Sequence, residues 1–400
     1  MIKQEQGFTL VELMITMVVF VLVMAASSQI FVVLLNQFKQ QNKMAEMHIE
    51  GAIGLNILRR DLEHAGYGLP WDLNGATYRE AEVDNSTTWT DRDMNDGPPD
   101  NPNRGLCPSP PNPPAACDAN GSSNPPSGVR SLNNDINAFN RSDVLAIKSS
   151  NVAMNNTSQG WTTLGAGDVK TAGLSGEVLQ NTDRVIVLSP ANKTRTLQVD
   201  AGVNWYTTYN TTAAFAPPAT SVGDTNVIYG IKPQDADDYM GNRPRMPFNR
   251  ADYYIRRPAA GMPPGCAPNT GILYKSMLNH KDGTHTEYPV LNCAADMQVV
   301  YNVNGVGWTD DTSNFTTAAL RNNLIEVRVY ILAQEGQKDL NYTHTVSADD
   351  KFMCGGSDTK IYVGDRNVGG GRCFDFTAIN ANYRWKLYNL VVQPSNLRAQ

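Results

Sequence analysis

The chain of 400 residues is long enough for one large domain or two modest ones, each with its own hydrophobic core. Its 33 Lys and Arg against 39 Asp and Glu give a formal net charge of -6, which argues against nucleic acid as the main partner. With 32 Gly, 23 Pro and only 18% charged residues, the composition predicts a β-rich, loop-rich body like that of a secreted protein.

The first element is an apolar segment that contains one acidic residue. Between Phe8 and Leu35 the only charged residue is Glu12. Such a segment is long enough to cross a bilayer as a helix, which needs about 20 residues. A carboxylate near the bilayer centre costs about 2.5 to 3.5 kcal/mol, so we expect Glu12 to have a function and to be neutralised in its working state. Gly7 precedes the apolar core, so cleavage there would leave the membrane helix on the mature protein, unlike cleavage of a secretory signal.

After Leu35 the pattern becomes amphipathic, which predicts one continuous helix from about Thr9 to His64. Such a rod is roughly 80 Å long at 1.5 Å per residue. Its first half is expected in lipid and its second half docked on the head. The recurring apolar residues of the second half are Leu35, Phe38, Ala45, Ile49, Ala52, Leu55, Leu58 and Leu62, and the helix stops at Gly66, Gly68 and Pro70.

A wider apolar face of the same helix offers a second surface. It includes Met44, Met47, Ile53 and Ile57, which we expect to meet helices of neighbouring subunits. Gly51 and Gly54 each weaken the helix by about 1 kcal/mol relative to alanine, and they permit bending or a close approach.

Residues 72–128 are dense in Pro, Asn and Asp and low in apolar periodicity, which predicts an exposed excursion. Within it, Asp91, Asp93 and Asn95 alternate as calcium ligands do. An EF-hand loop has Gly at its sixth position and Glu at its twelfth, where this chain has Asp96 and Pro102. We therefore expect a solvated turn, with a calcium site as the weaker alternative, and we expect no cofactor.

The pattern of the remainder of the chain predicts a series of strands joined by short or irregular connections, which favours antiparallel sheets. The fold class predicted is α+β, a long N-terminal helix packed on a β-rich, mainly antiparallel head. The division is leader 1–7, membrane and assembly half 8–35, amphipathic half 36–65, Pro/Asn-rich excursion 66–128 and head 129–400. The strand segments are 142–150, 183–189, 225–231, 251–257, 270–276, 296–303, 324–333 and 383–393.

The six cysteines form no CxxC pair, so their spacing does not suit zinc ribbons, iron–sulfur clusters or haem attachment. Disulfides are the better interpretation, and they indicate an oxidising compartment. Six cysteines allow 15 connectivities. We favour sequential pairs because each closes a short loop: Cys107–Cys117, Cys266–Cys293 and Cys354–Cys373.

Two further patterns, an arginine-rich segment and the histidines, are candidates for functional sites. An arginine-rich segment with aromatic residues resembles a single-stranded nucleic-acid surface, but the net acidity favours a structural edge strand with charged flanks. The histidines belong to no HExxH, no GxSxG is present and VGGGRC lacks the P-loop ending, so we expect surface or helix positions and no enzyme. The segment contains Arg243, Arg245, Phe248, Arg250, Tyr253, Tyr254, Arg256 and Arg257; the histidines are His48, His64, His280, His285 and His344.

GFTLVEL resembles the type III signal of type IV pilins and type II secretion pseudopilins. In that family a prepilin peptidase cuts after the glycine, here Gly7, and methylates the new amino terminus, here Phe8. Later segments look like landmarks of PilW-type minor pilins over most of residues 8–398, with 72–128 unmatched. These segments are RRDLEHAGYG, ILYKS, ADMQVVYNV, LIEVRVYILA and YRWKLYNLVVQPSNLR.

The resemblance implies a role for Glu12 as the fifth residue of the mature chain, paired with the amino terminus of a neighbouring subunit so that the axial register is set. The alternative is a glutamate that snorkels to the membrane surface from an ordinary anchor. The implied function is a minor pilin that primes type IV pilus assembly at or near the tip. Its implied partners are other minor pilins, the major pilin and prepilin peptidase, with a tip adhesin as a further candidate.

The implied location is the bacterial inner membrane, with a single pass and the head in the periplasm, and then the extracellular pilus. Two other readings stay open. One is the J-type pseudopilin of a type II secretion system, whose signal looks the same. The other is a pilus-borne adhesin or binding subunit.

Overall fold

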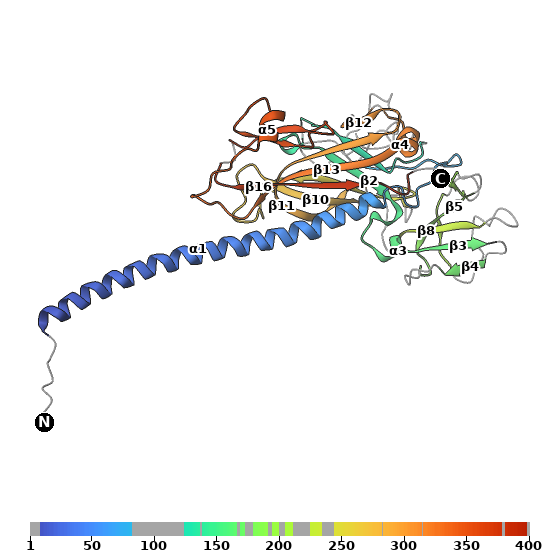
Figure 1. The fold of residues 1–400 in the computed structure, drawn as a ribbon. Coiled ribbons are helices and arrows are strands. Elements are labelled where there is room, and N and C mark those ends of the chain that lie inside the picture. Colours follow the sequence, from blue (N-terminus) through green and yellow to red (C-terminus); the bar gives the residue numbers. More distant parts are fainter. Residues whose placement is uncertain are drawn as a thin grey trace.

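A long helix, α1 (Leu10–Glu63), leaves the head as a rod and ends far from it at the amino-terminal side (Figure 1). Thr9 caps its start and His64 its end, so its bounds match the predicted helix. This computed structural model describes residues 9–81, 124–136, 138–165, 169–172, 179–190, 194–199, 205–210, 225–233, 244–281, 283–313, 315–377 and 381–397.

The head is built on an antiparallel sheet that has eight strands within the described residues. All the predicted strand segments from 251 onward, and 142–150, fall in this sheet. In sheet order its strands are β1 (Val129–Leu132), β2 (Val144–Ser149), β9 (Asn249–Arg256), β10 (Gly271–Leu278), β11 (His285–Val303), β13 (Leu324–Glu335) and β16 (Arg384–Val392), with β12 (Gly307–Thr309) paired to β11. The predicted fold class, a long helix followed by an antiparallel β-sheet head, is confirmed.

A smaller antiparallel sheet lies beyond the carboxyl end of α1 (Figure 1). Its strands are β4 (Val169–Ala172), β3 (Trp161–Gly165), β8 (Asn226–Lys232), β5 (Arg184–Ser189) and β6 (Thr196–Leu197), with β7 (Thr207–Thr208) paired to β5. A separate hairpin is formed by β14 (Lys360–Val363) and β15 (Arg372–Asp375). The short helical elements are η2 (Phe139–Arg141), η3 (Ser150–Val152), α3 (Asn156–Gln159), α4 (Thr317–Asn323) and α5 (Ala348–Met353).

The main core lies between α1 and one face of the large sheet. Leu55, Leu58 and Leu62 of α1 pack there against residues from β2, β9, β10, β11, β13 and β16. The sequence of β2 is apolar from Val144 to Ile147 because both faces of the strand are buried. Leu145 and Ile147 face this core, while their neighbours face the opposite side of the sheet. On that opposite face, Ala138 and Met262 pack against β2, β9 and β10. The segment that carries α5, β14 and β15 packs against β11 and β13.

The arginine-rich segment forms β9, which is a central strand between β2 and β10 and not the edge strand we expected. Arg250 and Asp252 of this strand are buried and paired, whereas Arg256 at its end is partly exposed. Arg250 donates to both carboxylate oxygens of Asp252 at 2.8 Å, and Arg250 and Lys148 both reach Glu80 Oε2, at 2.8 and 2.7 Å. Because these partners satisfy each other, a strand with this many charges can lie inside the head.

The chain just after α1 also differs from expectation. We expected an exposed excursion from residue 72, but Leu73 and Tyr78 are buried in a second core with Phe248, and Glu80 is 4% exposed. Residues 72–81 therefore belong to the packed body. Residues 82–123 lie outside the described residues, and with them Cys107 and Cys117.

Two of the expected disulfides are present. Cys266–Cys293 joins the loop before β10 to β11, and Cys354–Cys373 joins the end of α5 to β15. Cys293 has φ 54°, close to the register shift between Ala294 and Asp296 in the pairing of β11 with β13. The first disulfide therefore sits at an irregularity of the longest strand.

Candidate assembly site on the N-terminal helix

Glu12 closes a capping box at the start of α1. Its carboxylate accepts hydrogen bonds from the Thr9 backbone N–H at 3.1 Å and from Thr9 Oγ1 at 3.0 Å. In return, Thr9 Oγ1 accepts from the Glu12 backbone N–H at 3.3 Å. This reciprocal arrangement satisfies donors that the first turn leaves open, and it places the carboxylate at the positive end of the helix dipole.

Glu12 is exposed, and no cationic side chain among the described residues forms an ion pair with it. Within the described residues the carboxylate is therefore hydrogen-bonded but not neutralised by a cation. Gly7 and Phe8, the predicted cleavage and methylation positions, lie outside the described residues.

The first half of α1 exposes apolar side chains on every side. From Leu10 to Leu35 each residue is exposed, with Phe20 at 63% and Phe31 at 61%. Among the described residues, α1 is the one helix long and apolar enough to cross a membrane, with a mean hydropathy of 2.6 over its most apolar window. A soluble monomer rarely exposes an apolar surface of this size, and such a surface is typical of a segment that lipid or other helices cover.

The part of α1 that packs against the head begins further along the sequence than the apolar pattern predicted. The buried stripe starts at Met47, which we had placed on the outward face, whereas Phe38 and Ile49 from the predicted docking stripe are 61% exposed. Ile53 and Ile57 remain outward, at 61% and 38% exposure. A straight helix can present only one line of residues to the sheet, and the position of the head decides which one.

The expected close approach at the helix glycines is confirmed. A Cβ on Gly54 would lie 1.9 Å from the Val290 carbonyl oxygen of β11. A Cβ on Gly51 would lie 3.1 Å from Tyr388 Oη, which is the end of a side chain. Gly54 therefore allows the helix backbone to approach the sheet backbone directly.

A buried polar contact fixes the carboxyl end of α1. Asp61 accepts from Lys275 Nζ of β10 at 2.6 Å and from Tyr253 Oη of β9 at 2.6 Å. Burial raises the pKa of Asp61, an effect that Lys275 partly offsets, and burial with the neighbouring carboxylate raises the pKa of Tyr253. Because the contact needs three elements at once, it sets both the depth and the rotation of the docked helix.

The arginine-rich segment forms no basic surface in the described structure. Arg245 and Arg250 are buried, Arg256 pairs with Glu287, and Arg257 donates to the Thr270 carbonyl oxygen. Its aromatic residues Phe248, Tyr253 and Tyr254 are buried as well, while Arg243 lies outside the described residues. The segment is part of the core of the head.

Two histidines are not where we expected them. His48 and His64 lie on or at the end of α1 as predicted, but His280 is 7% exposed and the side chain of His285 is 2% exposed. Burial, with nearby Lys232 and Arg245, lowers the pKa of His280 to about 3. The ring is therefore neutral: its Nδ1 accepts from the Arg245 N–H and its Nε2–H donates to Asn249 Oδ1, both at 3.1 Å.

The calcium candidates Asp91, Asp93 and Asn95 lie outside the described residues. Within the described part of the chain, no group of three or more His, Cys, Asp and Glu side chains is placed to hold a metal ion.

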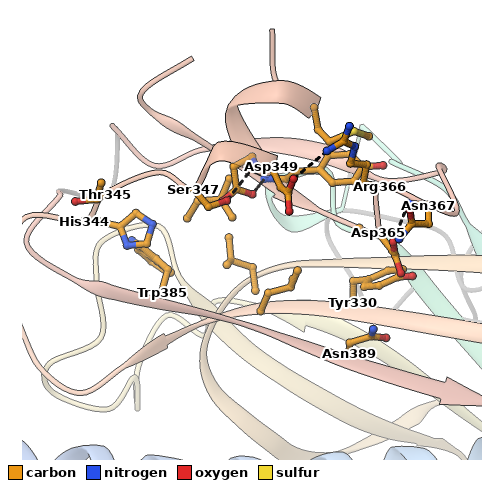
Figure 2. Close-up of a pocket in the computed structure, with 17 residues that line it drawn as sticks. Tyr330, His344, Thr345, Ser347, Asp349, Asp365, Arg366, Asn367, Trp385 and Asn389 are labelled. Carbon is orange, nitrogen blue, oxygen red and sulfur yellow. Dashed lines mark hydrogen bonds and ion pairs between the residues drawn. The ribbon is translucent and has the colours of Figure 1, made fainter. Parts of the chain in front are cut away.

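A hollow of about 690 Å³ lies between β13 and β16 on one side and the α5 segment on the other (Figure 2). Figure 2 shows Trp385 and His344 at one end and Asn389 at the other. Of its carboxylates, Asp349 pairs with Arg366 at 3.1 Å and Asp365 with Arg328 at 3.2 Å, while Asp350 accepts from Ser347 Oγ and from the Tyr362 N–H. Burial lowers the pKa of His344, so this ring is also neutral near pH 7.

Sequence reasoning missed the capping box, although the signal was present. Thr9-Leu10-Val11-Glu12 has the Thr-x-x-Glu spacing of a helix start. It also missed the buried ion pairs, for which the chain has no local signal, since Asp61 and Lys275 are more than 200 residues apart in the sequence.

Comparison with known proteins identifies the amino-terminal segment. The model of the prokaryotic N-terminal methylation motif matches residues 2–28. No curated protein gives a significant match. Among solved structures the chain is similar to "Type IV-like pilin TTHA1219 from Thermus thermophilus", with 13% sequence identity and a TM-score of 0.24, over 38% of this chain and 66% of that chain, just under two thirds of its length. That likeness is too low to support a conclusion, whereas the motif match covers Gly7, Phe8 and Glu12 directly.

Proposed function

We propose that this chain is a minor pilin that is processed at the inner membrane, helps to prime assembly of a type IV pilus and sits at or near its tip. The observation that carries the proposal is the N-terminal methylation motif at residues 2–28, which runs without a break into a helix whose apolar first half is exposed. In this scheme prepilin peptidase cuts after Gly7 and methylates Phe8, and the apolar half of α1 moves from lipid into contact with other pilin helices.

Glu12 supplies the specificity of that transfer. Its carboxylate pairs with the amino terminus of a neighbouring subunit, which cleavage has released. The pair attracts strongly in a low-dielectric surrounding, although dehydration of both charges offsets much of the gain. Its value is therefore register, because a subunit at another axial offset leaves two charges unpaired in an apolar environment.

The size of the chain favours a minor role. A chain of 400 residues whose head has a large sheet and a smaller one is awkward to repeat along a close-packed shaft. The J-type pseudopilin of a type II secretion system is the second candidate, because the same motif serves both assemblies. The partners in either case are other pilin-like subunits.

Deletion of the gene separates these functions. Loss of surface pili with normal secretion supports the minor pilin. Blocked secretion of exoproteins with intact pili would assign the pseudopilin instead. Normal piliation with loss of attachment would assign an adhesin or binding subunit.

The Glu12→Ala variant tests the assembly site itself. We expect cleavage after Gly7 to proceed, since the motif glycine and Phe8 are intact, and we expect the amount of protein in sheared pili to fall relative to the membrane. Immunoblots of both fractions measure this ratio. Wild-type incorporation of the variant would contradict the role given to Glu12.

A further inference from the structure

We propose that the free edge of β16 receives an extended segment of a different subunit of the same assembly, which adds a strand to the large sheet. Within the described residues β16 pairs with β13 alone and ends the sheet. Alternate backbone N–H and C=O groups along its nine residues therefore point away from the sheet. Such an edge is a template for another strand.

The two edge strands of the large sheet differ in length and in the capping of their backbone groups. The opposite edge, β1, has four residues, and its Ser131 is capped: the Ser131 N–H donates to Thr312 Oγ1 at 3.1 Å, and Thr312 Oγ1 donates to the Ser131 carbonyl at 3.3 Å. Strand β16 is more than twice as long, and its stretch Leu387–Val392 has no charge and no proline. Leu387 and Val391 are 37% and 41% exposed. An unguarded apolar edge of this length favours aggregation unless a partner covers it.

Hollows flank this edge on both faces of the sheet. Trp385, Leu387 and Asn389 line the 690 Å³ hollow of Figure 2. Tyr388, Asn389 and Leu390 line a hollow of about 200 Å³ on the side of α1. Asn389 borders both, so the hollows meet at the edge of β16. An added strand directs successive side chains to opposite faces, and each face here offers a space to receive them.

Arg59 indicates the chemistry of the incoming strand. It is exposed, it borders the smaller hollow, and the described residues form no ion pair with it. A carboxylate on the α1-facing side of the added strand would meet this guanidinium, while apolar or amide side chains would enter the larger hollow.

A second copy of the same chain does not fit as well. Two identical strands that pair antiparallel are related by a two-fold axis, which reverses every direction along the strand. In Figure 1 α1 and β16 run in the same general direction across the head. The two α1 helices would then point in opposite directions, which is incompatible with anchoring in one membrane. This geometry argues against antiparallel pairing of β16 with β16 of a second copy, so we assign the partner to a different subunit, and the inference rests on the proposed function in this respect.

Photo-crosslinking in the native cell tests this. A photoreactive amino acid replaces Asn389 at the edge, Phe31 on the apolar half of α1, or Ile136, which is 74% exposed near the opposite edge, in the full-length protein. We expect position 389 to link to an extended segment of another pilin-like subunit, identified by mass spectrometry, and position 136 to give no such product. Arg59→Glu should lower the yield at 389 by about tenfold, the effect of reversing one charge of an interfacial pair, whereas Arg59→Lys should keep it.

The outcomes are distinct. Links from position 31 without links from 389 would show that the edge stays free in the assembly, and would overturn this proposal alone. Links from 389 to a second copy of the chain would overturn the choice of partner. If neither position 31 nor position 389 links to any pilin-like subunit, both the proposed assembly function and this proposal are wrong.

Discussion

Glu12 has two physical roles at the residue scale, and they can be separated. As the third residue of α1 it closes a capping box with Thr9. Its carboxylate also lies in an apolar segment, and the proposed function gives this charge a partner in the assembled pilus. A neutral acceptor can fill the first role but not the second.

Glu12→Gln therefore distinguishes capping from charge pairing. Glutamine can still accept from the Thr9 N–H, so we expect the capping box to remain and incorporation into pili to fall as in Glu12→Ala. Thr9→Val removes the cap, which costs about 0.5 to 2 kcal/mol at a helix start, but it keeps the charge, so incorporation should fall less. The measurement is the ratio of protein in sheared pili to protein in membranes. Incorporation of the Glu12→Gln variant at the wild-type level would show that Glu12 acts only as a capping residue.

His280 makes the stability of the head depend on pH. Its folded pKa of about 3 lies below its ordinary value of 6.5, so between these values the unfolded chain binds a proton that the folded chain does not. The stabilisation is complete above about pH 6.5 and is lost as the pH falls toward 3, at no more than about 1.4 kcal/mol per pH unit.

The His280→Gln variant isolates this group. Loss of the hydrogen bonds to Arg245 and Asn249 should destabilise the variant by about 1 to 3 kcal/mol at pH 7. The difference from the wild type should narrow as the pH is lowered from 7 to 4.5, because only the wild type titrates at this position. Denaturant unfolding of the detergent-solubilised chain measures both values. A difference that does not change with pH would contradict a buried neutral histidine.

At the element scale, α1 changes its surroundings along its length. Its first half exposes apolar side chains all round, while its second half buries one stripe that includes Met47, Leu58 and Leu62. The close contact at Gly54 and the polar contact at Asp61 lie in this second half. These contacts fix the depth and the rotation of the second half of α1 against the large sheet. The second half in turn orients the first half.

Gly54→Ala tests the depth of docking, with Gly51→Ala as the matched control. Alanine favours a helix by about 1 kcal/mol over glycine. At position 54 its Cβ would meet the Val290 backbone, so the helix must shift, and we expect net destabilisation within the about 1 to 3 kcal/mol typical of overpacking. At position 51 the Tyr388 side chain can turn away, so little change is expected. Thermal unfolding of both variants compares them; equal effects would argue against a rigidly seated helix.

At the scale of the whole molecule, the two described disulfides both act on the large sheet and the segment that covers it. Cys266–Cys293 ties a loop to β11, and Cys354–Cys373 ties α5 to β15. They close 27 and 19 residues, respectively. The fold should therefore depend on an oxidising compartment.

Replacement of each pair by serine should lower the free energy of unfolding by about 3 kcal/mol, the range expected for loops of this length. For Cys354–Cys373 we expect the loss to fall mainly on the α5 segment, because β15 is tied to α5 there. Hydrogen exchange of oxidised wild type and variant measures it. Exchange that rises equally across the smaller sheet would contradict this local assignment.

The sequence by itself determined the features that depend on neighbours in the chain. The helix follows from continuous apolar periodicity that begins at Thr9 and stops at Gly66, Gly68 and Pro70, and the strand segments follow from their alternating or β-branched residues. The methylation motif is likewise a local pattern of residues. Each of these signals is complete within a short stretch, so no distant contact is needed to read it.

The tertiary structure alone decided which surfaces are buried. It placed β9 at the centre of a sheet with paired charges, His280 in the interior and Met47 under the head, each against expectation. Within the described residues it also left β16 at an edge of the large sheet, and it brought Asp61 to Lys275. Burial is a property of which distant segments meet, and a polar side chain is tolerated inside only when its partner arrives from elsewhere in the chain.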